Sequence, residues 1–207
     1  MISLMDPLCY FIKSGDDVFE IETDFRAWVA FEITLSDTKK TNEQKFFEII
    51  QRYKNKAPQD AQKAIDGLLW FYQGGESKDQ KPENKPSPVA SPIRKQGSAI
   101  YDFEQDAGLI YAAFRQAYNI DLLRTDYLHW WTFRALFLAL PGNTKLVEVM
   151  GIRATKLDGL SDAEKQRIRE LQKLYQLKKD EQPQMTMEER KQSIQEYARQ
   201  RLGQMQP

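Results

Sequence analysis

The first part of the chain alternates short β-prone runs with turn-forming residues. Residues 8–12 and 18–22 are rich in aromatic and β-branched side chains, and the sequence 14–17 between them contains Gly15, which tolerates a positive φ. This pattern predicts a β-hairpin. Because an isolated hairpin is only marginally stable in water, we expect it to cover the start of a helical lobe.

Three stretches with apolar residues at spacings of three and four follow the expected hairpin, and each predicts an amphipathic helix. Thr23 is the expected N-cap of the first helix. The second is expected to open with the capping box Thr41-x-x-Gln44, in which each side chain bonds the other residue's backbone N–H. The third is expected to begin at Pro58 and to end at the glycine pair 74–75.

Residues 76–98 differ in kind, because they are rich in proline and charged residues and poor in apolar ones. Such a stretch cannot bury enough surface to offset the cost of ordering its backbone, about 1–2 kcal/mol per residue. Its five basic and three acidic residues would also suit a weak docking strand. The composition favours a disordered, solvated linker over such a strand.

Helical periodicity resumes after this segment. Asp102 is expected to cap a helix that has Gln105 at its third position. Residues 127–140 carry apolar side chains on nearly every side, which predicts a single helix that is buried all round. Asn143 is the expected cap of a short helix that Gly151 closes.

Two further helices are expected at the C-terminal end. The capping box Ser161-x-x-Glu164 predicts the start of one, and Thr186-x-x-Glu189 predicts the start of the last. The apolar stripe of the last helix, which includes Ile194, is thin. That segment is therefore predicted to be either a helix that needs a partner or a mobile tail.

The predicted fold is mainly α. It consists of an N-terminal β-hairpin and three-helix lobe over residues 1–75, a disordered linker over 76–98, a second, aromatic-rich helical lobe over 99–180, and a C-terminal helix or mobile tail over 181–207.

Charge and composition argue against several classes of protein. The 30 basic residues cancel the 30 acidic ones, whereas nucleic-acid binders usually carry a basic excess. The single cysteine, Cys9, allows no internal disulfide and fits a reducing cytosol. No run approaches the roughly 18–20 apolar residues that a membrane helix needs, and the N-terminus does not resemble a secretory signal. We therefore expect no nucleic-acid or membrane partner.

Catalytic chemistry has few candidates. The sequence contains no glycine-rich phosphate loop and no cysteine–histidine cluster with metal spacing, so neither a cofactor nor a metal is expected. Cys9 and His129 could pair, but Cys9 on a hairpin strand is better explained as a small hydrophobe. His129 is expected to be a hydrogen-bonded core histidine whose tautomer Asp126 fixes.

For two other sets of side chains, a structural role explains the pattern better than a functional one. Trp130 and Trp131 could stack on nucleobases, but no basic patch surrounds them, so packing is the better interpretation. The carboxylates near residue 104 resemble first-turn helix charges rather than an acid–base pair; they are Asp102, Glu104 and Asp106.

Several runs, in order over about residues 18–177, resemble one family: the small tail-module protein of siphophages known as bacteriophage gene product fifteen. The strongest run is Tyr127-Leu128-His129-Trp130-Trp131-x-Phe133. The others lie within residues 23–28, 68–75, 101–106, 110–114, 118–122, 135–137, 150–153 and 174–175. The residues that carry the resemblance, interpreted as structural, are Thr23, Asp24, Phe25, Arg26, Trp28, Trp70, Phe71, Tyr72, Tyr111, Phe114, Tyr127, His129, Trp130, Trp131, Phe133, Gly151 and Arg153.

The resemblance implies a function without catalytic residues. Members of the family are similar in gene position to tail assembly chaperones, which are encoded between the major tail tube protein and the tape measure protein. It implies a non-enzymatic protein of the bacterial host cytoplasm that binds the tape measure protein, keeps its long helical surface soluble and aids tail tube polymerisation during phage or prophage assembly. The tube protein is a second implied partner, and self-association stays open.

A different function also fits the resemblance. The chain could be a structural minor tail or tail-completion protein that is present in the virion. An enzyme and a DNA-binding regulator are the remaining hypotheses. Two lobes joined by a tether over residues 76–98 could hold two partners close together, so we expect a shorter tether to impair assembly while both lobes stay folded.

Overall fold

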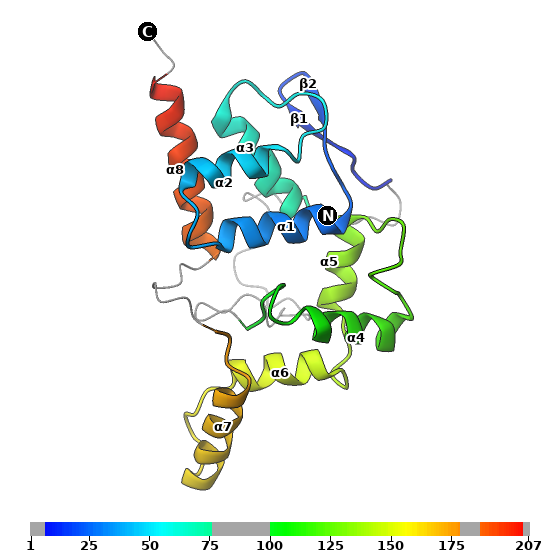
Figure 1. The fold of residues 1–207 in the computed structure, drawn as a ribbon, viewed down its shortest axis with the longest axis vertical. Coiled ribbons are helices and arrows are strands. Elements are labelled where there is room, and N and C mark those ends of the chain that lie inside the picture. The colour runs from blue at the N-terminus through cyan, green and yellow to red at the C-terminus, as the bar shows by residue number, and fades with distance from the viewer. Residues whose placement is uncertain (1–6, 76–99, 179–186, 205–207) are drawn as a thin grey trace. The chain divides into compact units, whose positions relative to one another are not determined.

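The computed structural model describes residues 7–75, 100–178 and 187–204. The predicted linker over 76–98 and the predicted cap at Thr186 lie outside these residues. The chain forms two compact units (Figure 1): unit 1 comprises residues 1–85, 126–135 and 185–207, and unit 2 comprises residues 86–125 and 136–184. Mainly helical structure with an N-terminal β-hairpin confirms the predicted fold class.

The hairpin consists of β1 (Phe11–Ser14) and β2 (Asp17–Glu20), which pair antiparallel with Ser14 opposite Asp17. Gly15 lies in the two-residue turn with φ of 64°, a conformation that glycine adopts without strain. Ile12 and Phe19 are opposite each other and both are buried. The side-chain alternation of the strands therefore sets which face of the hairpin packs on the protein.

Four helices accompany the hairpin in unit 1: α1 (Phe25–Ser36), α2 (Asn42–Ile50), α3 (Ala61–Tyr72) and α8 (Met187–Gln204). The predicted capping box of Thr41 and Gln44 is present at the start of α2. Two predicted starts are wrong. Asp24, not Thr23, caps α1, and α3 begins after Asp60, whose carboxylate accepts two backbone N–H bonds, rather than at Pro58.

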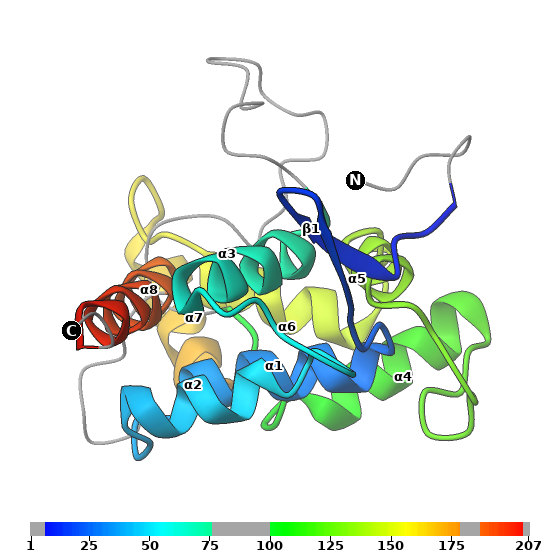
Figure 2. The same ribbon diagram turned by 90° about the horizontal axis from the view of Figure 1, so that it is seen from above.

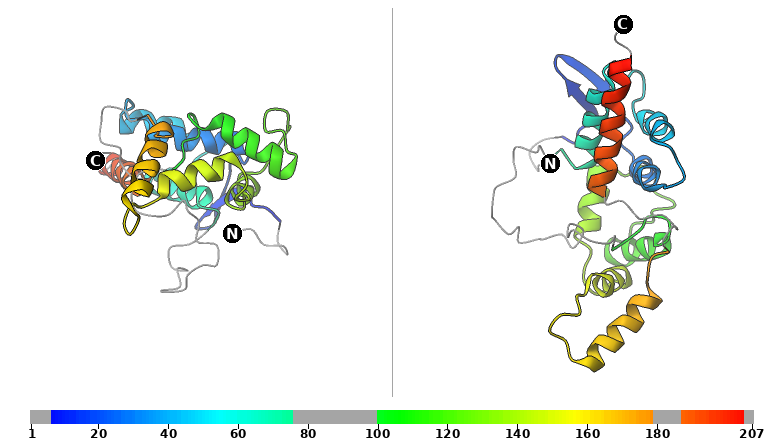
Figure 3. Two further views of the ribbon diagram at one scale, coloured as in Figure 1. Left: turned by 90° about the horizontal axis from the view of Figure 1, so that it is seen from below. Right: turned by 90° about the vertical axis from the view of Figure 1, so that its left-hand side faces the viewer.

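Helix α3 lies at the centre of unit 1. The hairpin and α8 pack on opposite sides of it (Figures 1 and 2), and α8 runs alongside it (Figure 3, right). Large side chains that are fully buried in this unit come from α3, from the other three helices and from residues 21 and 133; they are Ile21, Trp28, Phe31, Leu35, Ile49, Ile65, Leu68, Phe71, Phe133 and Ile194.

Unit 2 contains α4 (Ala107–Tyr118), α6 (Lys145–Ala154) and α7 (Asp162–Leu174). The capping box of Ser161 and Glu164 confirms the predicted start of α7, although this helix has no buried residue. Asp102 accepts bonds from the N–H groups of residues 104 and 105 as predicted, but it caps a turn, and α4 starts only at Ala107.

Other predicted helix limits in this region are wrong. The pattern predicts one helix over 127–140 that is buried all round, but α5 covers only Trp130–Leu138, and Tyr127 before it is 46% exposed. Thr144 rather than Asn143 is the N-cap of α6, and Gly151 lies inside that helix instead of closing it.

The predicted domain boundaries also differ from the two units. The prediction places residues 126–135 in the second lobe and residues 185–207 in a separate C-terminal segment, yet both belong to unit 1. The reason is packing: the indoles of this segment bond the end of α3, and α8 contacts α1, α2 and α3. The chain therefore passes between the units at several places and not only along the predicted tether.

Candidate interaction site

Two segments that carry the family resemblance meet along their backbones in unit 1. The N–H of Phe25 donates to the carbonyl of Leu128 over 2.8 Å, and the N–H of Trp130 donates to the carbonyl of Thr23 over 2.7 Å. An isolated β-bridge joins Asp24 to His129 between these bonds. The start of α1 and the start of α5 are therefore held together although about a hundred residues separate them.

Three indole N–H groups in this region all donate to backbone carbonyls. Trp28 bonds the carbonyl of Glu22 over 2.8 Å, Trp130 that of Tyr72 over 2.9 Å, and Trp131 that of Phe71 over 2.8 Å. The indoles are buried, and the ring of Trp130 is stacked on Tyr72 with 5.4 Å between centroids. Their faces are covered by protein, so the arrangement does not suit stacking on nucleobases.

The remaining aromatic motif residues of unit 1 surround these indoles. Phe25 stacks on Phe133 with centroids 4.8 Å apart, and Phe71 lies 4.7 Å from Trp28. Trp70 is half-buried and meets the edge of Trp131 at 5.9 Å. Such contacts between rings stabilise a folded core by more than the apolar area they bury.

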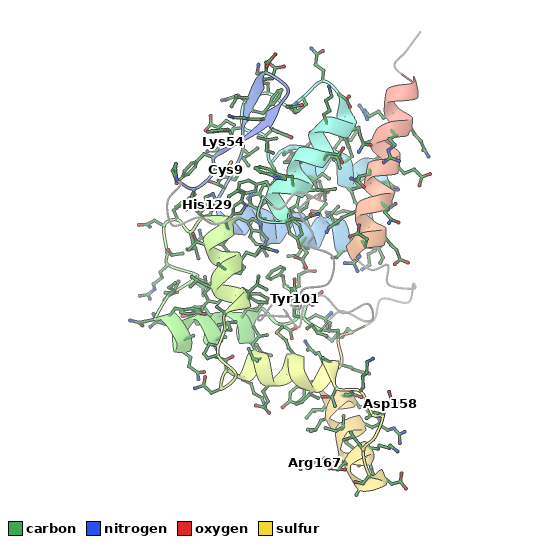
Figure 4. The ribbon with its side chains drawn as sticks, turned by 180° about the vertical axis from the view of Figure 1, so that it is seen from behind. Cys9, Lys54, Tyr101, His129, Asp158 and Arg167 are labelled. Carbon is green, nitrogen blue, oxygen red and sulfur yellow. The ribbon has the colours of Figure 1, made fainter. Side chains whose placement is uncertain are left out.

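His129 is 2% exposed and both of its ring nitrogens have a partner. Nδ1 accepts the backbone N–H of Trp131 over 3.0 Å, so Nε2 must carry the proton that it donates to the carbonyl of Cys9 over 2.8 Å (Figure 4). The prediction that Asp126 fixes the tautomer is wrong, because these two backbone groups do so. Burial lowers the pKa of His129, against the opposing effect of the Cys9 carbonyl.

Cys9 meets His129 through its backbone and not through its thiol. Its Sγ donates to the carbonyl of Phe11 over 2.8 Å, and the residue is half-buried. A cysteine–histidine nucleophile requires the sulfur to face the imidazole. The geometry here does not have that arrangement.

Polar motif residues at the start of α1 complete the cluster. The hydroxyl of Thr23 is hydrogen-bonded to that of Tyr127 over 2.8 Å. Asp24 accepts the N–H of Arg26 over 2.9 Å as the helix cap, and it also forms an ion pair with the Arg26 guanidinium at 3.1 Å. These contacts orient the first turn of α1.

The motif residues of unit 2 centre on Arg153. Its guanidinium makes a two-pronged ion pair with Asp106 at 2.6 and 2.9 Å and also donates to the carbonyls of Tyr175 and Ile100. Both charged side chains are buried, so the prediction that Asp106 is a first-turn surface charge is wrong. Periodicity alone could not reveal the pair, because Asp106 precedes α4 whereas Arg153 lies on α6.

The other motif residues of unit 2 differ in their surroundings. Phe114 is fully buried, and the hydroxyl of half-buried Tyr111 approaches the carboxylate of Asp121 at 3.5 Å. Gly151 is exposed, and a Cβ added to it would meet nothing within 4 Å. Packing within unit 2 therefore gives no reason for a glycine at this position.

One surface of unit 1 already binds a helix. α8 lies on α1, α2 and α3 and buries Ile194 and Ala198, which are four residues apart and 1% and 0% exposed. Around them, the side-chain amide of Asn42 donates to the Ser193 hydroxyl over 2.9 Å, and that of Gln195 donates to Asp66 over 2.6 Å. We call the part of α1, α2 and α3 that α8 covers the α8 groove.

Basic residues of α8 extend the contact along the groove. Arg201 lies over the rings of Phe46 and Phe47 at 5.3 and 4.9 Å, and Lys191 lies over Tyr72 at 5.9 Å. A cation over an aromatic face is attracted by the negative potential of the ring. The sequence predicts that Ile194 belongs to an apolar stripe, but it does not predict which surface covers this residue, because such a stripe indicates burial and not the partner that provides it.

A second surface of unit 1 carries exposed apolar side chains. Phe11 and Val18 project from the outer face of the hairpin, 43% and 50% exposed, beside Lys13 and Glu20 on the same face. The alternation of the predicted strands could have identified both, since each neighbours a residue that points inward.

Two absences concern only the described residues. Within 7–75, 100–178 and 187–204, no three His, Cys, Asp or Glu side chains are grouped so that they could hold a metal ion. Across the same ranges, no helix has the length and apolarity needed to cross a membrane.

Comparison with known proteins identifies the chain. No curated protein and no solved structure shows a significant match. A family model described as Bacteriophage Gp15 protein matches residues 4–177, which is most of the chain and includes β1, β2 and helices α1 to α7. Because the match covers residues 4–177, well over half of the chain, this chain belongs to the Bacteriophage Gp15 protein family.

Proposed function

We propose that this phage structural or assembly protein is a non-enzymatic tail assembly chaperone that binds the tape measure protein and aids tail tube polymerisation. The family supports the coarser part of this function, a role in phage structure or assembly together with other phage proteins. The finer part is our inference from what the family resemblance implies, and a helix-binding surface of unit 1 is compatible with it.

The observation that carries the proposal is the α8 groove. A surface that holds one helix through two buried apolar positions and a polar rim is suited to amphipathic helices in general, because recognition in such grooves depends on residues spaced by three and four. A tape measure protein with a long helical surface offers many segments of this kind. Binding would cover their apolar faces and prevent aggregation.

Polar groups of the aromatic cluster support a non-catalytic role. Both nitrogens of His129 and the three indole N–H groups are used by backbone bonds inside the fold. A general base must reach the proton of a substrate. His129, at 2% exposed, is not placed to do so.

Co-expression tests the proposal directly. The tagged chain and the tape measure protein encoded with it should co-purify, and the tape measure protein should be less soluble when it is expressed alone. Mass spectrometry of purified particles should find the chain absent or depleted. Stoichiometric recovery in finished virions would instead support a structural minor tail or tail-completion protein, and failure to co-purify would contradict the proposed partner.

A further inference from the structure

α8 stands apart from the rest of unit 1 in one respect. The family match ends at residue 177, whereas α8 begins at Met187. The three helices that form the α8 groove all lie inside the match. The groove is thus made by family-defined residues and is filled by a helix from outside them.

The contact of α8 with the groove is modest in its apolar part. Ile194 and Ala198 are the α8 side chains that are buried among those described. The ring of half-buried Tyr197 adds a contact with Phe46 at 5.7 Å between centroids. Most of the remaining contacts are polar or cationic: Arg190 donates to the Ser36 hydroxyl, and Gln195 donates to Asp66. Polar contacts at the rim of an interface can be replaced by contacts with water at little cost in free energy. They therefore fix how the helix is aligned in the groove more than they strengthen its binding.

The side chains of α8 define what the groove accepts. Along the helix they are a cation at Arg190, an aliphatic group at Ile194, a small residue at Ala198 and a second cation at Arg201. The groove contacts them with the hydroxyl of Ser36, the carboxylate of Asp66 and the aromatic faces of α2. An occupant therefore needs an amphipathic helix with an aliphatic residue, a small residue four positions later, and basic residues about one turn to either side of this pair.

We propose that α8 is an internal occupant of this groove, and that an amphipathic helix of the tape measure protein with the same pattern displaces it. The inference rests on the proposed function for the identity of the partner. Because α8 is tethered to the groove, it competes at high effective concentration and lowers the affinity of the free protein for any other helix. Because each incoming helix must first displace α8, a single isolated helix would bind weakly. A partner that presents many such helices in a row would bind tightly.

A peptide experiment tests the groove without the tape measure protein. A labelled peptide of residues 187–204 is titrated into the full chain and into its Ala198→Glu variant, and binding is followed by fluorescence anisotropy. Ala198 is fully buried, so a carboxylate there should expel α8 and open the groove. We expect the variant to bind the peptide at least tenfold more tightly than the wild-type chain does.

Matched controls separate displacement from general damage. Arg199→Glu changes an exposed position next to the same site and should leave peptide affinity at the wild-type value. A peptide that carries the Ala198→Glu change itself should not bind either protein. A folded Ala198→Glu chain, shown by circular dichroism, that binds the peptide no better than wild type would overturn the inference.

Hydrogen exchange on the wild-type chain gives a second measurement that needs no variant to fold. When the tape measure protein binds, the amides of α8 should exchange faster while those of α1–α3 stay protected. A complex that leaves α8 exchange unchanged would refute displacement and keep the proposed function. No complex at all would refute the proposed partner, and the peptide titration would still decide the groove.

A second copy of the chain is the competing occupant. If α8 were exchanged between copies, the wild-type protein would form a concentration-dependent dimer in sedimentation experiments, and Ala198→Glu would abolish it. That result would assign the groove to self-association and overturn the proposal.

Discussion

His129 shows how burial and two hydrogen bonds select one protonation state. Its Nδ1 is an acceptor for the N–H of Trp131, so a proton added there would remove that bond and place a charge in the core. Desolvation accordingly lowers its pKa from the ordinary value, and the Cys9 carbonyl opposes this only in part. The neutral imidazole is the form that the fold requires.

This pKa shift predicts how stability depends on pH. Below the ordinary value of about 6.5 the unfolded chain binds a proton that the folded chain does not, so the free energy of unfolding should fall as the pH drops from 7 towards 5 and stay level above 7.5. Urea titrations across this range measure it. His129→Gln, which keeps a donor for the Cys9 carbonyl but cannot titrate, should show a smaller fall; an equal fall in both proteins would contradict the prediction.

The buried pair of Arg153 and Asp106 makes a second prediction at this scale. Arg153→Met removes the cation and leaves a buried carboxylate without compensation, which should lower the free energy of unfolding by about 3–5 kcal/mol. Thermal or urea denaturation measures the loss. The control is Lys165→Met, which breaks an ion pair on the exposed side of α7 and should change stability little.

At the scale of elements, α3 depends on a glycine for its contact with the hairpin. A Cβ at Gly67 would lie 2.7 Å from the Cγ2 of Ile12 and 2.9 Å from the hydroxyl of Tyr53. Neither neighbour can move easily, because Ile12 is buried and the Tyr53 hydroxyl donates to the Ala64 carbonyl. The close approach of β1 to α3 explains why a poor helix former lies inside this helix.

Glycine-to-alanine substitutions in two helices should therefore have opposite effects. Gly67→Ala should destabilise the protein by about 1–3 kcal/mol, because the added methyl group overpacks the contact with the hairpin. Gly151→Ala in α6, where a Cβ meets nothing within 4 Å, should stabilise it by up to about 1 kcal/mol through helix propensity. Melting temperatures compare the two. Stabilisation by Gly67→Ala would show that the hairpin does not pack as described.

At the scale of the whole molecule, unit 1 is assembled from three stretches of chain. Residues 126–135 and α8 both pack on the first stretch, so unit 1 needs all three. Residues 1–75 alone lack the partners of the Phe71 and Tyr72 carbonyls and the helix that covers the α8 groove. The expectation that this segment folds as a lobe by itself does not agree with this arrangement.

Cleavage of the chain between the first two stretches gives a test. A protease site inserted near residue 88 should allow the chain to be cut while both pieces stay together in size-exclusion chromatography, because contacts within unit 1 join them. Residues 1–75 expressed alone should lack a cooperative unfolding transition. Separation of the cut pieces, with residues 1–75 still folded, would contradict the assembly of unit 1 from three stretches.

The sequence by itself determined the features that depend on interactions between residues a few positions apart in the chain. The hairpin follows from strand alternation and Gly15, and α2 and α7 begin at capping boxes whose two members are three residues apart. The family, too, could be identified from runs of sequence. These predictions were confirmed because the groups that satisfy each backbone N–H are local and present in the pattern itself.

Only the tertiary structure decided the features that depend on distant partners. Thr23 was a plausible cap, but its hydroxyl is bonded to Tyr127, 104 residues away, and Asp24 caps α1 instead. Likewise, His129 takes its partners from Cys9 and Trp131, and Ile194 of α8 finds its cover on α1–α3. The type of a residue indicates whether it needs burial or a hydrogen-bond partner, but only the fold determines which residue provides it.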